Sequence, residues 1–450
     1  MADSSDHGST TQLAVLGAFR AALRSPHYAA LLAQALIDPG DVRTFADFQR
    51  LVPVIRKDQL FGSAVPFHRL CMDGTLPRVR SVMVSSGFSG RFTFAVATID
   101  ELRATVSAID DELDRYFGTR QTPTLLINAL AMGIHFPTRQ PLAETGPRSD
   151  SVLHILEHFG PYFEQVIIVA DPHVLKEIVD EGNHARIAWQ ARNVSFVAGG
   201  DWMPETLRSY IYAQTGIADD AHRVLIQTMG LTELGLNILA ESRETIRLRR
   251  IASADARLRD ALFPGAGAAV PSLFHYDPRR FHIESIPHPE GRELVFTSLL
   301  PRAVPMIRYA TGDLGGVIAP QALADVLATC GHEALTPSLP LPCAWVCGRA
   351  STRTSAAAGL HAETLRHGLY SDPAVAAAVT GHFTVHTPAG SQRAAVQLRR
   401  GTTPSGALRA ATQRALFSVA ATDLPTDIYA YDDYPFGKAL DHERKFSHLH

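Results

Sequence analysis

Two serines and two glycines follow a strand-like run near residue 80. The run is Val79–Val84, and the next residues read Ser-Ser-Gly-Phe-Ser-Gly over 85–90. Backbone N–H groups and short hydroxyls in such a turn can surround a polyanion, so the segment is a candidate phosphate-binding loop. The alternative is a plain connection between elements, because Gly-Ser turns are common.

A carboxylate follows a second strand-like run in the sequence. Val224–Ile226 leads into Thr228-Met-Gly-Leu-Thr232-Glu233. An acid after a glycine-containing turn at a strand end suits Mg²⁺ held against phosphate oxygens. The alternative is a helix start, since Thr232 and Glu233 are good N-cap and first-turn residues.

A third acidic turn comes after a Glu-Leu-Val-Phe-Thr strand. The sequence Arg308-Tyr-Ala-Thr-Gly-Asp313 ends in a carboxylate that can accept hydrogen bonds from both hydroxyls of a ribose. The alternative is a Gly-Asp turn between two strands.

Short apolar runs predict the elements that position these residues. Thr124–Leu130, Gln165–Ala170 and Val194–Ala198 are nearly all apolar, as in strands buried on both faces of a parallel sheet. Helix-like segments separate them at 151–159 and 174–181. This alternation of strands and helices predicts a doubly wound α/β domain, in which ligands bind outside the carboxyl ends of the strands.

The later sequence changes character. Runs at 273–276, 281–284 and 293–297 are divided by turn signals, which predicts antiparallel strands beside the first sheet. Gly/Ala/Ser-rich sequence from Ala350 to Gly359 places a domain boundary near Gly348. We therefore predict an α/β protein with an antiparallel β subregion and a small α+β lid. The domain scheme is a disordered tail at 1–12, a large domain at 13–347 and the lid at 348–450.

The composition describes a globular protein of more than one domain. The 450 residues are 46% apolar and carry a net charge of −3. The chain therefore lacks the overall positive charge that is typical of proteins that bind nucleic acid. No apolar stretch approaches the ~20 residues of a membrane span, and the polar N-terminus is unlike a secretory signal. Four cysteines fit a reducing compartment, which predicts a cytoplasmic protein. The pair Cys343 and Cys347 is expected to be two thiols rather than a metal site.

In their order and spacing, the three motifs resemble those of the adenylate-forming superfamily of acyl-CoA synthetases, nonribosomal adenylation domains and luciferases. The nearest branch is the phenylacetate-CoA ligase-like group. The resemblance runs from about Arg56 to the C-terminus. It implies ATP and Mg²⁺ as cofactors and a large α/β region followed by a small rotating lid.

The resemblance also implies a role for each matching residue. Glu233 would carry Mg²⁺, Thr232 would belong to the catalytic residues, and Asp313 would bind the ribose. The residues expected at ATP are Ser85, Ser86, Gly87, Ser89 and Gly90 at the phosphates, Gly199, Gly200 and Asp201 beside adenine, Met229 and Gly230 at the second motif, Tyr309 at the third, and Arg349 near ribose or phosphate.

Several positions depart from the family pattern. Phe88 replaces a Thr or Ser of the loop, and Phe92-Thr93 replaces the usual Pro-Lys, which removes one hydroxyl and one cation. In the lid, Ser351 stands at the hinge position, and Gly359-Leu-His361 replaces a hairpin that lines the pantetheine tunnel of CoA users. This departure disfavours a CoA-dependent second step.

The lid should also bring a lysine to the reacting carboxylate and α-phosphate, where a cation offsets developing charge. Lys438 follows Gly437 as in the family, and Lys445 is the second candidate. The alternative for Lys445 is a charged surface helix end.

The resemblance implies an acid-binding segment directly after the first parallel strand. Gly133, His135 and Phe136 stand there, with apolar neighbours that favour an aromatic or fatty acid over an amino acid. The alternative for His135 is a hydrogen-bonded structural residue.

The predicted function is activation of a carboxylic acid as acyl-AMP with release of pyrophosphate, followed by transfer to an acceptor. CoA, a carrier-protein thiol and an amine are the acceptors considered. Two alternatives are activation of another oxyanion, such as nitrite, to modify an amine, and a catalytically impaired nucleotide-binding homologue. No nucleic-acid or membrane partner is expected.

Overall fold

Two compact units make up the chain. The computed structural model describes residues 4–61, 65–85, 93–131, 134–217, 223–266, 270–349, 362–388, 391–420 and 424–436. One unit joins residues 1–108 with 229–350, and the other joins 109–228 with 351–450. The two domains predicted from the sequence, 13–347 and 348–450, do not coincide with these two units. The predicted domain division therefore stays a prediction.

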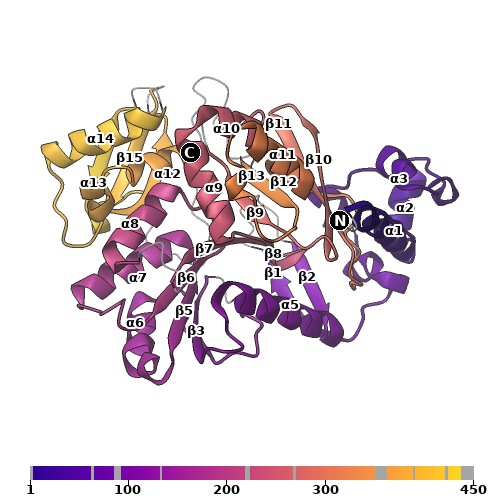
Figure 1. The fold of residues 1–450 in the computed structure, drawn as a ribbon, viewed down its shortest axis with the longest axis horizontal. Helices are drawn as coiled ribbons and strands as arrows, with labels where there is room; N and C mark the ends of the chain where they lie inside the picture. Colours follow the sequence, from indigo (N-terminus) through magenta and orange to yellow (C-terminus); the bar gives the residue numbers. More distant parts are fainter. Residues whose placement is uncertain are drawn as a thin grey trace. The chain divides into compact units, whose positions relative to one another are not determined.

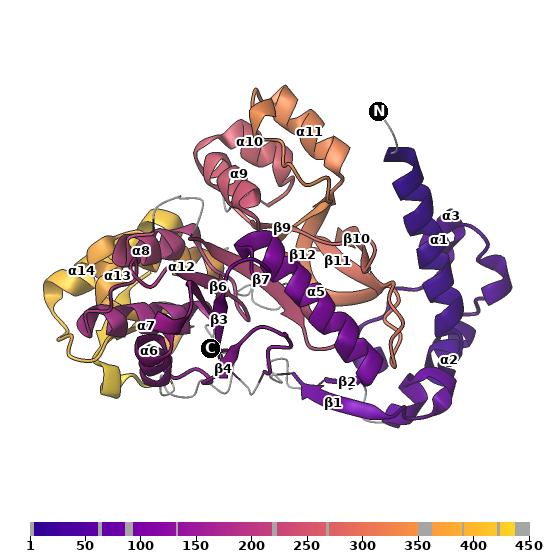
Figure 2. The ribbon, with the colours of Figure 1, turned by 60° about the horizontal axis from the view of Figure 1, so that its bottom comes forward.

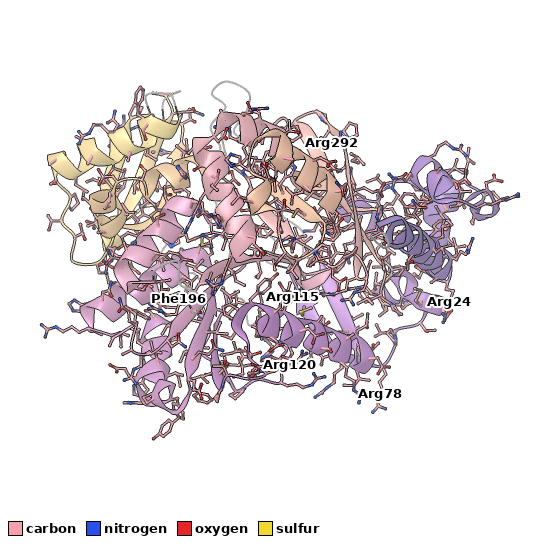
Figure 3. The ribbon with its side chains drawn as sticks, viewed as in Figure 1. Arg24, Arg78, Arg115, Arg120, Phe196 and Arg292 are labelled. Carbon is pink, nitrogen blue, oxygen red and sulfur yellow. The ribbon has the colours of Figure 1, made fainter. Side chains whose placement is uncertain are left out.

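The second unit is built on a parallel sheet, as the apolar runs predict. Its strands pair in the order β4-β3-β5-β6-β7, all parallel. Every residue of β3, β5 and β6 is buried, and Phe196 of β6, labelled in Figure 3, has no exposed surface. The bounds are β3 Thr124–Ala129, β4 Leu142–Glu144, α6 Ser149–His158, β5 Gln165–Ala170, α7 Pro172–His184, β6 Val194–Ala198, α8 Glu205–Thr215 and β7 Leu225–Leu231, whose last residues enter the first unit.

The C-terminal elements of this unit form a three-stranded sheet with helices beside it (Figure 1). Strands β14 and β15 are antiparallel, whereas β15 and β16 are parallel. The bounds are α12 Ala362–Leu369, α13 Pro373–Ala378, β14 Val379–His386, β15 Arg393–Leu398, α14 Gly406–Ala420 and β16 Thr426–Tyr429.

The first unit contains the predicted antiparallel strands, paired in the order β10-β11-β12-β13-β9-β8. A separate hairpin of β1 and β2 carries the ends of the Ser-Gly loop. The strands are β1 Val79–Val84, β2 Phe94–Thr98, β8 Gly235–Ala240, β9 Ser272–His275, β10 Phe281–His288, β11 Gly291–Ser298, β12 Tyr309–Ile318 and β13 Cys343–Arg349. The helices are α1 Ser4–Ala22, α2 Pro26–Gln34, α3 Phe45–Leu51, α4 Lys57–Leu60, α9 Arg243–Ala254, α10 Ala256–Leu262, α11 Pro320–Thr329 and α5 Ile99–Phe117, which continues into the second unit.

Both faces of this antiparallel sheet are covered. Side chains alternate between the faces of a strand, and the sequence of β13 follows that rule. Cys343 and Trp345 join a core with α9, α10 and α11, which lie together above the sheet in Figure 2. Ala344 and Val346 join a second core with the N-terminal helices.

The N-terminal segment differs from the prediction. Helix α1 begins at Ser4, so the disorder predicted for residues 1–12 is wrong from that residue onward. The polar residues before Leu13 continue the helix that the apolar periodicity of the following residues predicts. Within the described ranges, no helix combines the length and apolar character that a bilayer crossing requires.

Candidate functional site

The two ends of the Ser-Gly loop are fixed to each other in the first unit. The Ser85 N–H donates to the Thr93 carbonyl over 2.9 Å, and the Thr93 N–H donates to Ser85 Oγ over 2.9 Å. These bonds extend the pairing of β1 with β2 to the base of the loop. The other predicted loop residues, 86, 87, 89 and 90, lie outside the described residues.

Glu233 lies in the turn between β7 and β8, so the helix-start alternative is wrong. The strand continues to Leu231, and the chain reverses within three residues. Tyr309 Oη donates to Glu233 Oε1 over 2.7 Å, and Thr93 Oγ1 donates to Glu233 Oε2 over 3.4 Å. Burial and the Glu233 carboxylate both raise the pKa of Tyr309, so its hydroxyl stays a donor. Two neutral hydroxyls thus orient the carboxylate without neutralising it.

A glycine is required beneath this turn. A Cβ on Gly230 would stand 3.0 Å from Leu236 Cα and 3.1 Å from the Gly235 carbonyl oxygen, both backbone atoms that cannot yield cheaply. Of the predicted residues, Met229 lies in strand β7 and Thr232 in the turn that follows, and both are half-buried.

Arg302 holds the turn from the side. Its guanidinium donates to the Leu234 carbonyl over 2.6 Å and to the Glu233 carbonyl over 3.0 Å. Burial lowers the pKa of Arg302, and the carboxylates of Glu101 and Glu233 oppose that shift. The backbone of the turn is therefore fixed independently of the Glu233 side chain.

A lysine shares the electrostatic environment of Glu233. Partial burial lowers the pKa of Lys57, the Glu233 carboxylate opposes this shift, and the Arg349 guanidinium adds to it. Lys57 opens helix α4, immediately after Arg56, whose guanidinium forms a bidentate pair with Glu293. The pair with Glu293 anchors the start of the helix and hence the lysine.

Asp313 lies inside strand β12 rather than in a turn between strands, so the Gly-Asp turn alternative is wrong. Gly312 has a φ of +82°, and the β12–β13 register shifts between Asp313 and Gly315, so the strand is irregular here. Asp313 faces Arg349 of β13, whose Nε donates to its Oδ1 over 3.1 Å. Asp313 Oδ2 is buried and accepts no hydrogen bond from the described residues.

The Gly-Gly-acid turn belongs to the second unit and follows β6. Gly200 has a φ of +78°, and a Cβ there would lie 1.8 Å from Asp171 Oδ1. Both observations require glycine. Asp171 Oδ2 also accepts from the Ala131 N–H over 3.4 Å. The carboxylate of Asp171 therefore lies between this turn and the start of the predicted acid-binding segment.

The predicted acid-binding residues are only partly described. Gly133 lies outside the described residues, and the His135 side chain is 90% exposed with Nδ1 3.4 Å from Glu144 Oε1. The Phe136 N–H also faces Glu144 Oε1 at 3.4 Å. Asn128 donates to both Glu144 and the Ile134 carbonyl. Glu144 and Asn128 thus shape this segment, and the assignment of His135 to a substrate stays a prediction.

Both candidate lysines, Lys438 and Lys445, lie outside the described residues. The two cysteines Cys343 and Cys347 are free. Burial raises the pKa of Cys343 to about 12, and Cys347 Sγ donates to the Leu314 carbonyl. In the part of the chain that is described, no group of three or more His, Cys, Asp or Glu residues is placed to hold a metal.

In the first unit the structure thus brings Glu233, Tyr309 and the base of the Ser-Gly loop together, and joins Asp313 to Arg349. Sequence reasoning missed Thr93, Arg302 and Lys57 as members of this cluster. A signal existed for Thr93, which stands where the family has lysine. Lys57 and Arg302 are far from Glu233 in sequence, and no motif links them to it.

Comparison with known proteins supports the fold. No protein-family model matches the sequence, and no curated protein does either. A solved structure of 2-hydroxyisobutyryl-CoA ligase (HCL), in the postadenylation state in complex with 2-HIB-AMP, matches with a TM-score of 0.68 at 13% identity, over 100% of this chain and 93% of that chain. The anthranilate CoA ligase AuaEII in complex with anthranoyl-AMP matches with a TM-score of 0.54 at 14% identity, over 84% of this chain and 68% of that chain. These likenesses confirm the predicted α/β fold.

Proposed function

From this fold and the polar cluster of the first unit, we propose that the chain is an ATP- and Mg²⁺-dependent ligase that activates a carboxylic acid. A carboxylate oxygen of the acid bonds to the α-phosphorus of ATP, and the bond from that phosphorus to the bridging oxygen of the β-phosphate breaks. The products are acyl-AMP and pyrophosphate. A nucleophilic acceptor then bonds to the acyl carbon, and AMP leaves.

The observation that carries the proposal is the state of Asp313. Its Oδ2 is buried and has no partner in the described structure, while Oδ1 is held by Arg349. A buried acceptor without a partner is costly, and such atoms are rare unless a ligand or water satisfies them. A ribose hydroxyl is a donor that would satisfy this oxygen, because an ionised carboxylate accepts hydrogen bonds from hydroxyl groups.

Glu233 fits the metal role. Mg²⁺ is commonly bound through one or two carboxylates together with phosphate oxygens and waters. The hydroxyls of Tyr309 and Thr93 fix both carboxylate oxygens and leave their charge available. When bound, Mg²⁺ would neutralise phosphate charge as pyrophosphate leaves.

Lysine and arginine side chains of this chain would supply the rest of the positive charge that offsets the ATP phosphates. Lys57 and Arg349 lie in the electrostatic environment of Glu233 and Asp313 and carry positive charge where ATP phosphates are proposed. Lys57 would thereby compensate for the loop lysine that Thr93 replaces. Lys438, with Lys445 as second candidate, remains the proposed cation of the C-terminal segment, and Thr232 remains a proposed catalytic residue.

We further propose an aromatic or apolar acid as the substrate, on the apolar neighbours of His135. Anthranilate CoA ligase AuaEII, solved with anthranoyl-AMP, shows that this fold accommodates an aromatic acyl group. CoA, a carrier-protein thiol and an amine are the acceptors to be separated by experiment.

The test is pyrophosphate release with ATP, Mg²⁺ and a panel of aryl and fatty acids, with hydroxylamine present to trap acyl-AMP. We expect acid-dependent release, lost in Lys438→Ala and retained in Lys445→Ala. ATP binding without turnover of any acid would contradict the ligase and favour the impaired homologue, whose signature is the altered loop at Phe88. Full activity in both lysine variants would remove both lysines from the mechanism.

A further inference from the structure

Two histidines lie one turn apart at the end of helix α6 in the second unit. His154 and His158 are separated by four positions, and residues at this spacing lie on the same face of a helix. Their imidazole rings are neighbours, with centroids 4.1 Å apart. Metal–nitrogen bonds of about 2.0–2.1 Å place two ligating nitrogens about 3 Å apart. The two rings are therefore close enough to bind one metal ion after a small rotation of the side chains.

The opposite face of α6 is fixed in the apolar core. Val152 and Leu156 have no exposed surface and belong to the core cluster of the second unit, and the helix packs beside α7 (Figure 1). A helix turns by about 100° per residue, so His154 and His158 lie about half a turn away from these two side chains. Both histidines are exposed. The core thus holds the helix in place while the histidine pair faces the solvent.

The ring nitrogens of this pair are available to a ligand. Within the described ranges, neither imidazole makes a hydrogen bond or an ion pair. Other histidines differ in this respect, since His135 faces Glu144 and His332 pairs with Asp255. Imidazole nitrogens are ligands for zinc, nickel and copper ions. The pair therefore offers two ligands to such an ion without the loss of an existing contact among the described residues.

The charge around the pair favours a cation. His158 is the last residue of α6, and the C-terminal end of a helix carries partial negative charge. Glu157 is exposed in the same turn and adds a carboxylate. The helix contains no lysine or arginine, and Arg148, directly before it, is paired with Asp150 over 2.6 Å. A divalent cation at the pair would thus meet negative charge from the helix end and from Glu157.

We propose that His154 and His158 form a binding site for a divalent transition metal ion of the zinc, nickel and copper class. Among the described residues, no group of three or more His, Cys, Asp or Glu is placed to hold a metal, so water would fill the remaining coordination positions. Two histidines four residues apart on one helix face are a known zinc-binding pattern.

This site is independent of the proposed ligase reaction. The Mg²⁺ of that reaction prefers oxygen ligands, and Glu233, its proposed ligand, belongs to the other unit. An ion that bridges two turns of α6 binds the folded helix better than the unfolded chain. Zinc should therefore raise the Tm of the protein.

The experiment measures Zn²⁺ binding by calorimetry, and the Tm with and without Zn²⁺, after a chelator has removed metal and has itself been dialysed away. The full chain is compared with His154→Gln, His158→Gln and the control His184→Gln. His184 is also exposed and also ends a helix, α7, but no histidine lies four residues before or after it. We expect His154→Gln and His158→Gln each to weaken Zn²⁺ binding at least tenfold and to abolish the rise in Tm. His184→Gln should bind Zn²⁺ within twofold of the parent.

Cu²⁺ supplies a second measurement, because it has the highest affinity for nitrogen ligands in this series of ions. Electron paramagnetic resonance of bound Cu²⁺ reports how many nitrogens bind it. With less than one equivalent of Cu²⁺, the full chain should show two imidazole nitrogens. The variant that carries both His154→Gln and His158→Gln should lose this signal.

Equal Kd values for Zn²⁺ in the full chain and in the variant with both substitutions would overturn the proposal, because the ion would then bind elsewhere. A full chain that binds no Zn²⁺ would also overturn it. If a substitution lowers the Tm of the metal-free protein, the Cu²⁺ spectrum of the full chain decides, and fewer than two bound nitrogens would reject the site. Pyrophosphate release tests the ligase separately, so the two proposals can fail independently.

Discussion

Glu233 and Asp313, the two acidic side chains of the proposed site, are oriented by contacts within the protein and can still bind a ligand. Tyr309 and Thr93 fix Glu233 with uncharged donors, and Arg349 binds one oxygen of Asp313 while the other stays unpartnered among the described residues. A carboxylate held in this way loses little freedom when a ligand binds, so more of the interaction energy appears as affinity.

Asp313→Asn should reveal the ribose contact. The amide keeps the shape of the side chain but removes the anionic acceptor, and hydrogen bonds to charged groups contribute about 1.5–3 kcal/mol. We expect kcat/KM for ATP to fall about tenfold to a hundredfold, and the loss to be smaller with 2′-deoxy- or 3′-deoxy-ATP, which lack one partner hydroxyl. Asp325→Asn on the surface helix α11 is the control. An equal loss with ATP and both deoxy analogues would contradict ribose binding.

Glu233→Gln should change the metal requirement. Glutamine retains an oxygen acceptor for Tyr309 but loses the negative charge that favours Mg²⁺. The Mg²⁺ concentration at half-maximal pyrophosphate release is expected to rise at least tenfold, with partial recovery of the rate at high Mg²⁺. Glu333→Gln, in an exposed turn of the same unit, should titrate like the parent. Activity near that of the parent at low Mg²⁺ would remove Glu233 from the metal role.

At the scale of elements, the turn between β7 and β8 sets where the Glu233 carboxylate lies. A methyl group on Gly230 meets backbone atoms of residues 235–237 at 3.0–3.2 Å, so the two strands must separate slightly. Gly230→Ala is expected to lower adenylation more than tenfold while the chain stays folded, because the displacement falls on the strand ends and the turn rather than on the core. Pyrophosphate release and the Tm measure the two effects.

Gly17→Ala is the matched control for that substitution. Gly17 lies in helix α1, and a Cβ there meets nothing within 4 Å. Alanine in a helix is favoured over glycine by about 0.5–1 kcal/mol, so this variant should be as active as the parent and equally or more stable. A Gly230→Ala variant that retains full activity would show that the turn tolerates the shift.

The elements most accurately predicted from sequence are those whose environment is uniform. Strands β3, β5 and β6 are buried along their whole length, so an unbroken apolar run marks each of them. The turn at Thr232 and the strand around Asp313 were predicted less well. Thr232 and Glu233 suit a helix start locally, but the strand pairing of the hairpin overrides that preference. Gly312 and Asp313 resemble a turn because the strand is irregular there.

Long-range partners set the limit of prediction at the site. Arg366 and Asp201 are 165 residues apart, and Lys57 and Glu233 are 176 apart, so only the fold brings each pair together. The motif residues were found because each belongs to a short segment with its own spacing. Their supporting residues carry no such local pattern.

For the molecule as a whole, stability depends on buried charged groups as well as on the apolar cores. In the first unit Arg308 has a φ of +46°, makes a bidentate pair with Glu284 and donates to the Gln49 and Val52 carbonyls. Burial raises the pKa of Glu284, and the Arg308 guanidinium opposes the shift. Removing one member of such a buried pair is strongly destabilising, because the other charge remains buried and uncompensated.

A buried histidine near Arg308 contributes to the response of the first unit to acid. His282 of β10 packs edge-on against Phe45 with ring centroids 5.2 Å apart. Burial and, to a lesser extent, Arg308 lower the pKa of His282 to about 4 from the ordinary value of 6.5. Between these two pH values the unfolded chain binds a proton at His282 that the folded chain does not. The free energy of unfolding must therefore fall as the pH decreases from about 6.5 towards 4.

His282→Leu should remove this part of the acid sensitivity. One proton titrating across that interval changes the free energy of unfolding by about 3 kcal/mol. We expect the parent to lose about that much more stability than the variant between pH 7 and pH 4, as measured by urea unfolding at each pH. His154→Leu on helix α6 of the second unit is the control and should keep the slope of the parent. If the free energy of unfolding fell equally with pH in the parent and in His282→Leu, His282 would already be protonated in the folded chain. The stability lost in acid would then have to come from carboxylates that release an arginine partner when they are protonated.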